Sequence, residues 1–191
     1  VGITDQLSKK VRINPGMRFV DQHKSVILDW PRPQEIGAQG WHPSYRLHQP
    51  DLEILLREKL SSYSNALVKS STEVIAVDES QDNVEVVCRN IEDGSEERFR
   101  TKYLVGCDGA KSLIRNLIGS DLEDLGFKEK WLVVDLLLKR ERPDLGDHSI
   151  QFCDSVRPMT YCRNPGNRRR WEITMLDGET DEDITQSDRI W

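Results

Sequence analysis

One segment constrains the fold more than any other: an apolar run that ends in Asp-Gly and leads directly into a helical pattern. The run Tyr103 to Cys107 is typical of a buried strand, and Ser112 to Ile118 predicts a helix that Gly119 ends. A strand followed at once by a helix favours an α/β arrangement. It places Asp108 at the carboxyl end of the strand, which is where nucleotides bind in open α/β sheets.

The residues of this junction suit a ligand site. The Asp108 carboxylate can accept hydrogen bonds from ligand hydroxyls, and Gly109 has no Cβ, so that backbone can approach a ligand closely. The helix that follows offers unpaired N–H groups to a phosphate. A plain strand–turn–helix connection explains the same pattern equally well.

The remaining patterns predict many short strands and few helices, an α+β or α/β chain. Pro50 suits the first position of a helix over 50–62, whose leucines form one apolar stripe, and residues 1–13 read as the end of another helix. Strands are predicted at 17–21, 25–30, 67–70, 73–78, 84–90, 96–100, 131–139, 149–153, 159–163 and 169–176. The strands after Gly126 predict a mostly antiparallel sheet with one covered face and one polar or ligand-lined face.

Composition argues against several classes of partner. The 191 residues carry 27 Lys and Arg against 33 Asp and Glu, a net charge of −6, which gives little attraction to nucleic acid or anionic lipid. The basic run Arg168–Arg170 is too short to reverse this, and a solvated turn would explain it. The longest apolar stretch, Trp131 to Leu138, is far shorter than the roughly 20 residues that span a membrane.

The four cysteines, at 88, 107, 153 and 162, form no Cys-x-x-Cys pair and share no ligand spacing with the four histidines. No metal site is therefore expected. Cys88 and Cys107 lie in apolar strand patterns, so we expect buried thiols in a reducing compartment and a cytoplasmic protein.

The motif Tyr103 to Ser112, with Arg115, resembles the Asp-Gly motif of single-component flavoprotein aromatic hydroxylases, the group typified by p-hydroxybenzoate hydroxylase. Segments around Trp30–Glu35, Trp41–Glu53, Phe127–Leu138 and Ile150–Asp154 resemble the 3-(3-hydroxyphenyl)propionate hydroxylases within that group. The resemblance covers nearly the whole chain in order.

Two motifs of that family have no counterpart here: the Gly-x-Gly-x-x-Gly fingerprint for the FAD pyrophosphate and the Gly-Asp motif for the ribityl chain. We therefore expect this chain to be the central part of such an enzyme and to bind FAD poorly by itself. Residues 1–15 and 44–125 are expected to belong to a three-layer ββα-type FAD-binding domain. Residues 16–43 and 126–191 are expected to form the substrate-binding sheet.

The resemblance implies an FAD-dependent monooxygenase that takes electrons from NADH or NADPH and transfers oxygen from O₂. The substrate it implies is a small phenol such as 3-(3-hydroxyphenyl)propionate, hydroxylated ortho to its hydroxyl group. A homo-oligomer is compatible with it, and no nucleic acid or membrane partner is expected. Two other readings stay open: a hydroxylase of a larger aromatic polyketide, and a truncated, non-catalytic domain that binds an aromatic ligand or a partner chain.

The resemblance also implies site residues. A glutamine at the position of Gln49 reaches the flavin, although an N-terminal helix cap is an alternative. Arg46 could meet a flavin or nicotinamide phosphate, or form a surface salt bridge. Val74 matches a position whose backbone contacts the adenine end of FAD, and a core strand residue would look the same. Asp108 and Gly109 complete the cofactor-binding set on the side of the Asp-Gly motif.

Alternation along the strand 169–176 places Arg170, Glu172 and Thr174 on one face and Trp171, Ile173 and Met175 on the other. The apolar set is expected in the core, and the polar set faces solvent or a cavity under the flavin. The order of residues resembles the p-hydroxybenzoate hydroxylase segment whose arginine helps place the flavin. We therefore predict that Arg170 points toward the flavin ring and that Glu172 and Thr174 lie beside the substrate path.

Overall fold

The computed structural model describes residues 1–190, which divide into two compact units. One unit combines Val1–Tyr63 with the residues from Lys128 onward, and the other is Ser64–Phe127. The first contains α1 (Thr4–Ser8), β1 (Arg12–Ile13), β2 (Gly16–Val20), β3 (Val26–Pro31), β4 (Tyr45–Arg46), α2 (Gln49–Ser61), β8 (Trp131–Leu137), the 3-10 helix η1 (Pro143–Leu145), β9 (Ser149–Phe152), β10 (Met159–Arg163), β11 (Arg168–Thr174), α4 (Asp181–Ile184) and α5 (Ser187–Ile190). The second contains β5 (Thr72–Glu79), β6 (Val84–Asn90), β7 (Glu96–Thr101) and α3 (Leu113–Leu117).

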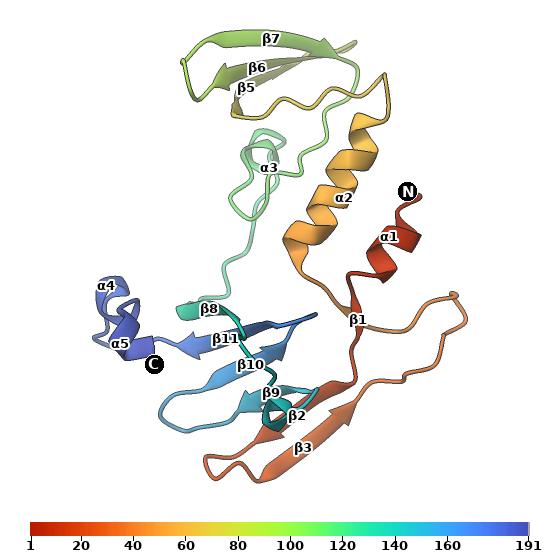
Figure 1. The fold of residues 1–191 in the computed structure, drawn as a ribbon. Coiled ribbons are helices and arrows are strands. Elements are labelled where there is room, and N and C mark those ends of the chain that lie inside the picture. The colour runs from red at the N-terminus through yellow and green to blue at the C-terminus, as the bar shows by residue number, and fades with distance from the viewer. Residues whose placement is uncertain (191) are drawn as a thin grey trace. The chain divides into compact units, whose positions relative to one another are not determined.

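A six-stranded sheet of order β3-β2-β9-β10-β11-β8 is the main element of the first unit (Figure 1). Every neighbouring pair is antiparallel except β2 and β9, which run parallel. Strands from residues 16–31 and from residues 131–174 thus share one sheet, and the mostly antiparallel sheet expected after Gly126 is confirmed. Whether this sheet binds substrate stays a prediction.

Aromatic side chains build the core on one face of this sheet. Tyr161 lies opposite Trp171 in the register of β10 and β11 and is 1% exposed, with the two ring centroids 5.1 Å apart. The Trp171 ring also stacks on Phe152 of β9 at 5.7 Å. Trp171 therefore lies in the core, as the alternation predicts, and Arg170 and Glu172 lie on the opposite face.

A short two-stranded sheet of β1 and β4 precedes α2 in the first unit. The turn into β2 needs glycine at position 16, where φ is +131° and a Cβ would lie 2.4 Å from the Trp30 carbonyl oxygen. Helix α2 has Pro50 in its first turn and buries Leu55, so the predicted helix at 50–62 is confirmed within one residue.

The second unit is a three-stranded antiparallel sheet of order β5-β6-β7, followed by α3. The strands predicted at 73–78, 84–90 and 96–100 are confirmed. Val86 and Cys88 of the central strand are the buried apolar residues of this unit among those described. A bulge between Val74 and Ala76 shifts the register of β5 against β6.

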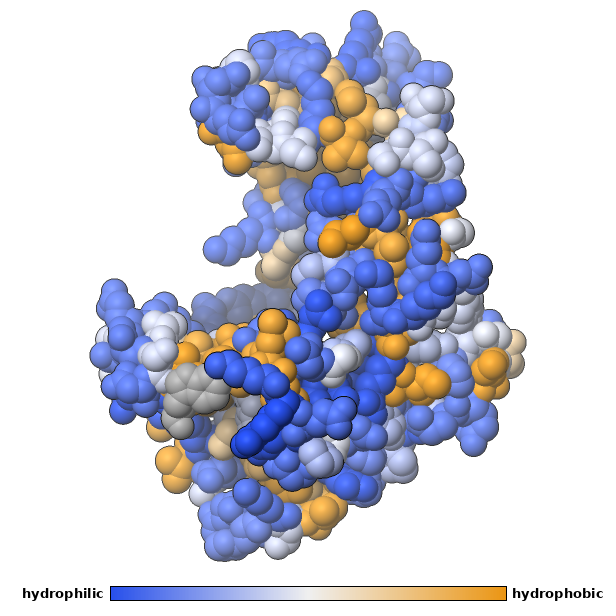
Figure 2. Space-filling view, viewed as in Figure 1, coloured by the Kyte–Doolittle hydropathy of each residue, from blue (hydrophilic) through white to orange (hydrophobic). Residues whose placement is uncertain are grey.

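The apolar run Tyr103 to Cys107 is not a strand, contrary to the sequence prediction. A strand requires a neighbour with which to exchange hydrogen bonds, and no described residue pairs with this run. Tyr103 and Val105 are consequently 84% and 78% exposed, and Cys107 is exposed rather than buried. Figure 2 shows apolar side chains on a mostly hydrophilic surface.

Two further element predictions are wrong. The helical spacing over 1–13 gives only the short α1 before β1, and residues 67–70 form no strand. The run Arg168–Arg170 lies within β11 rather than in a solvated turn. Among residues 1–190, no helix is long and apolar enough to cross a membrane.

Candidate functional site

A hollow of about 400 Å³ lies beside the first turn of α2, on the polar face of the six-stranded sheet. It is lined by Leu47, His48, Gln49, Pro50, Glu53, Asp135, Asn164 and Arg170. Two of the residues predicted for cofactor binding, Gln49 and Arg170, therefore meet here although 121 positions separate them in the sequence. The sheet supplies the guanidinium and the helix supplies the amide.

Arg170 is held in place by a carboxylate of the neighbouring strand. Its Nε and Nη2 donate to Asp135 Oδ1 and Oδ2 at 2.9 and 2.8 Å, and the two residues lie directly opposite in the register of β8 and β11. The hydrogen bonds from Arg170 lower the pKa of Asp135. A two-pronged pair of this kind fixes the plane of the guanidinium and leaves Nη1 outside the pair.

The pair also changes the expected electrostatics. We expected Arg170 to supply a positive charge, but Asp135 neutralises it, and Glu172 is a second carboxylate close enough to raise the pKa of Arg170. The Arg170 and Asp135 side chains are 41% and 61% exposed, so solvent screens their attraction. The arrangement therefore offers an oriented hydrogen-bond donor rather than a net positive field.

Gln49 begins α2, and its exposed side chain lies at the hollow. The residue before it, His48, has extended backbone geometry with φ −95° and ψ 112° and makes no side-chain capping bond. Pro50 then fixes the first helical turn. This entry into the helix places the Gln49 amide at the sheet face, where it can both donate and accept hydrogen bonds.

Arg46 is half-buried in β4, and its neighbour is an amide rather than a carboxylate. Its Nε donates to Asn14 Oδ1 at 3.0 Å, and Asn14 Nδ2 in turn donates to Ser44 Oγ at 3.0 Å. Burial lowers the pKa of Arg46, and an interaction with Cys162 partly offsets this. Cys162 lies directly opposite Arg170 in the sheet, so Arg46 belongs to the same region of the first unit.

Glu172 and Thr174 follow Arg170 on the same strand, but neither lines the hollow. The Thr174 hydroxyl donates to the Pro158 carbonyl oxygen at 2.8 Å, which occupies it in joining β11 to the segment before β10. Glu172 is half-buried and lies opposite Thr160 and Val133. Their predicted place beside a substrate path stays a prediction.

The Asp-Gly motif lies in the second unit, and its polar groups form hydrogen bonds with one another. The Asp108 carboxylate accepts from Ser112 Oγ at 2.5 Å and from the Ile114 N–H at 3.2 Å, and both bonds lower its pKa. Ser112 Oγ accepts from the Arg115 N–H at 3.0 Å, and Arg115 Nη2 donates to the Ala110 carbonyl oxygen. These N–H groups, which we expected a phosphate to bind, are thus taken within the loop.

Gly109 and Val74 also lie in the second unit. Gly109 has φ +79°, and a Cβ there would meet nothing within 4 Å, so the position is open as well as suited to glycine. Val74 is half-buried in β5 opposite Cys88, next to the bulge. A strand residue of this kind fits the packing alternative, and its contact with the adenine end of FAD stays a prediction.

Sequence reasoning missed Asp135, Asn164 and Asn14, which orient or accompany the predicted residues. Asp135 was visible as the one charge inside the apolar run 131–138, a pattern that marks a polar position on the ligand-lined face. Asn14 and Asn164 carried no such signal. No group of three or more His, Cys, Asp or Glu side chains within residues 1–190 could hold a metal ion.

The sequence profile of the FAD binding domain matches residues 1–187, nearly the entire chain. The chain belongs to the FAD-binding monooxygenase family. It is 30% identical to a probable NADH-specific resorcinol 4-hydroxylase of Rhodococcus jostii over 100% of this chain and 36% of that protein. It is 28% identical to a 3-(3-hydroxy-phenyl)propionate/3-hydroxycinnamic acid hydroxylase of Escherichia coli over 97% of this chain and 32% of that protein. The chain thus spans about a third of the length of these monooxygenases.

Two solved monooxygenase structures have a similar fold. The p-nitrophenol 4-monooxygenase PnpA of Pseudomonas putida superposes with a TM-score of 0.80 at 16% identity, covering 96% of this chain and 46% of PnpA. The flavin-dependent monooxygenase PieE, solved with FAD and substrate, superposes with a TM-score of 0.81 at 17% identity, covering 99% of this chain and 36% of PieE. The profile match confirms the family resemblance read from the sequence, and the superpositions show a partial FAD-binding domain fold.

Proposed function

We propose that this chain is part of an FAD-dependent monooxygenase that hydroxylates a small phenol at a ring position adjacent to its hydroxyl group. The observation that carries the proposal is the meeting of Gln49 and Arg170 in one hollow of a chain that belongs to the FAD-binding monooxygenase family. NADH or NADPH would supply the electrons and O₂ the oxygen atom.

The names of the relatives support a phenol with a second substituent in the meta position. Resorcinol carries its two hydroxyl groups in this relation, and 3-(3-hydroxyphenyl)propionate carries a hydroxyl and a propionate in the same relation. Position 4 of resorcinol is adjacent to a hydroxyl-bearing carbon. We therefore propose meta-substituted phenols as the substrate class, with 3-(3-hydroxyphenyl)propionate as the first compound to test.

The donors at the hollow fit the edge of a flavin ring, which presents both acceptors and an N–H. The Gln49 amide can donate and accept, and the Arg170 guanidinium, oriented by Asp135, can donate. When bound, FAD would supply the redox and oxygen-transfer chemistry. The chain's own part would be to hold the ring, with Arg46 reaching a phosphate group of flavin or nicotinamide.

Asp108 would act by ordering its own loop, because its carboxylate is not free to bind a ligand. Its two oxygens hold Ser112 and Ile114, which fixes the loop around Gly109 at the open position. The backbone of this loop, rather than the Asp108 side chain, would then face the cofactor. Val74 would contribute backbone only.

The test is product analysis with the intact protein and FAD. Resorcinol, 3-(3-hydroxyphenyl)propionate and the isomeric 3-(4-hydroxyphenyl)propionate are each supplied with NADH or NADPH. We expect dihydroxylated or trihydroxylated product from the two meta-substituted phenols and little from the para isomer. Oxidation of neither meta-substituted phenol, with FAD bound, would contradict the proposal and favour a non-catalytic domain or a larger aromatic substrate.

A further inference from the structure

Two arginines face each other on the aromatic face of the six-stranded sheet, on the side opposite the Gln49 hollow. Arg163 of β10 and Arg169 of β11 are direct partners in the strand register, next to the Tyr161–Trp171 pair. The Arg163 side chain is 16% exposed and Arg169 is 5% exposed. Like charges placed directly opposite one another in a sheet repel, and burial makes the repulsion harder to screen.

A third arginine adds to this charge. Arg12 of β1 acts electrostatically on both Arg163 and Tyr161. The carboxylate that meets these guanidinium groups is Asp147, 2.8 Å from Arg12 Nη2 and 3.8 Å from Arg163 Nε, and it is 63% exposed. Arg12, Arg163 and Arg169 carry three positive charges, and Asp147 is the carboxylate paired with them, so positive charge is in excess at this cluster.

Backbone carbonyl oxygens accept from Nη1 of both arginines, including those of Asn164 and Arg168, but other donors of the cluster have no acceptor. The Gly166 carbonyl oxygen accepts from Nη1 of both Arg163 and Arg169, at 2.9 and 3.1 Å. Arg169 Nε, Arg12 Nε and the Tyr161 hydroxyl are buried and have no hydrogen-bond partner among the residues that the structure describes. The two guanidinium nitrogens can only donate, so their missing partners are acceptors.

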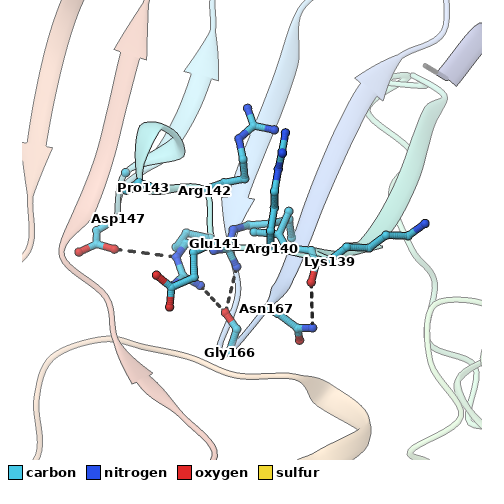
Figure 3. Close-up of a pocket in the computed structure, with 12 residues that line it drawn as sticks. Lys139, Arg140, Glu141, Arg142, Pro143, Asp147, Gly166 and Asn167 are labelled. Carbon is cyan, nitrogen blue, oxygen red and sulfur yellow. Dashed lines mark hydrogen bonds and ion pairs between the residues drawn. The ribbon is translucent and has the colours of Figure 1, made fainter.

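A hollow of about 630 Å³ opens onto Arg163 and Arg169. Figure 3 shows the loop of Arg140, Glu141, Arg142 and Asp147 on one side of it and Gly166 and Asn167 of the β10–β11 turn on the other. The Lys139 side chain extends away from the other labelled residues. In the loop, Arg142 is paired with Asp144 at 2.7 Å. Lys139, Arg140 and Glu141 also line the hollow, so the cationic side chains around it outnumber the carboxylates.

Burial and the neighbouring arginines both act on the cluster's protonation. Burial is the largest cause of the lowered pKa of Arg163, followed by the charges of Arg169 and Arg12. Burial likewise raises the pKa of Tyr161, so its hydroxyl keeps the proton that it can donate. A dianion bound in the hollow would relieve the repulsion and accept hydrogen bonds from Arg163 and Arg169, the two arginines of the cluster that line it.

We propose that the hollow between the loop 138–147 and the β10–β11 turn binds a phosphate group. A phosphate carries about two negative charges near neutral pH and several acceptor oxygens, which matches the uncompensated charge and the unpaired donors. The phosphate could be free or part of a nucleotide.

The test is a titration of the protein with inorganic phosphate at constant ionic strength. Calorimetry measures the binding, and the midpoint of thermal unfolding measures the stabilisation. We expect saturable binding and a raised midpoint for the wild type. Arg163→Gln should weaken phosphate binding about tenfold or more, because a charge-assisted hydrogen bond is lost. Arg18→Gln serves as the matched control, since Arg18 is an exposed arginine of the same sheet paired with Asp29, and it should bind phosphate like the wild type.

A second variant and competing ligands test the proposal further. If circular dichroism shows that Arg163→Gln does not fold, Arg12→Gln tests the same charge from another strand. Absence of saturable binding by the wild type would overturn the proposal. The proposal would also be overturned if the folded variant bound phosphate as tightly as the wild type does. Acetate binding as tightly as phosphate would overturn it as well. Displacement of phosphate by NADPH but not by NADH would identify a nucleotide 2′-phosphate as the source, and no displacement by either would identify free phosphate.

Discussion

The hollow around Gln49 and the loop around Asp108 hold their polar side chains in opposite ways. In the loop, Asp108, Ser112 and Arg115 bond to one another and to the local backbone, and the partners are at most six positions apart. At the hollow, Arg170 bonds to Asp135 from a strand 35 positions away, and the Gln49 side chain is exposed.

The difference teaches which residues can meet a ligand directly. A carboxylate whose oxygens both serve its own loop contributes by ordering the backbone, whereas an oriented guanidinium and an amide at a hollow can donate to a ligand without first giving up a bond. Removal of Asp108 should therefore weaken ligand binding by disordering its loop. Removal of the Arg170–Asp135 pair should remove a direct contact with the ligand.

The largest expected effect comes from Asp135→Ala in the intact protein. Loss of the two-pronged partner frees the Arg170 guanidinium to rotate, so we expect the product formed per NAD(P)H oxidised to fall, by about tenfold at most because the pair is partly exposed. Asp29→Ala, which breaks the exposed pair with Arg18 on the same sheet, should leave this ratio unchanged. Equal effects of the two variants would show that the hollow around Gln49 and Arg170 does not hold the cofactor.

A smaller effect is expected from Asp108→Ala, measured as FAD affinity of the intact protein. If Asp108 acts by ordering its loop, Ser112→Ala should weaken FAD to the same extent, because it removes the hydrogen bond to Asp108 and the cap to the Arg115 N–H. A much larger loss in Asp108→Ala than in Ser112→Ala would show a direct contact with the cofactor. No loss in either variant would remove the loop from the binding site.

The contrast between the two regions was only partly predictable from the sequence. Helix α2, the strands of the second unit and the alternation of β11 follow from local patterns, which is why Trp171 and Arg170 face the predicted sides. The prediction of a strand over Tyr103 to Cys107 was wrong because a strand needs a neighbouring strand, which the local sequence pattern does not reveal. Ser112 stands where a helix N-cap is expected, so part of the Asp108 loop was readable, but the pairing of Arg170 with Asp135 required the sheet register.

The smallest effect concerns acid stability of the unit that carries the hollow. Arg157 donates to both Glu179 oxygens, and these bonds, together with one from the Leu176 N–H, lower the pKa of Glu179 from 4.5 to about 2. A carboxyl whose folded pKa is lowered stabilises the fold above its unfolded pKa, and this contribution is lost as the pH falls from about 4.5 toward about 2.

The wild type should therefore lose thermal stability across that range, and Glu179→Gln should lose less because the titrating group is gone. Glu53→Gln, in the exposed helix pair with Arg57, is the control and should follow the wild type. Thermal midpoints taken from pH 6 to pH 3 measure this. Parallel curves for Glu179→Gln and the wild type would show that the bonds to the Glu179 carboxylate do not stabilise this unit.

The central claim is that the Arg170 fork, oriented by Asp135, contacts the flavin of a phenol hydroxylase. Arg170→Lys in the intact protein tests it most directly, because lysine keeps the charge and loses the planar fork. The measurement is the fraction of oxidised NAD(P)H that yields hydroxylated product from a meta-substituted phenol, with Arg18→Lys as control. We predict slower flavin reduction or a clearly lower fraction in Arg170→Lys alone. Wild-type rates and an unchanged fraction would contradict the claim and leave Arg170 as a residue of a solvated sheet face.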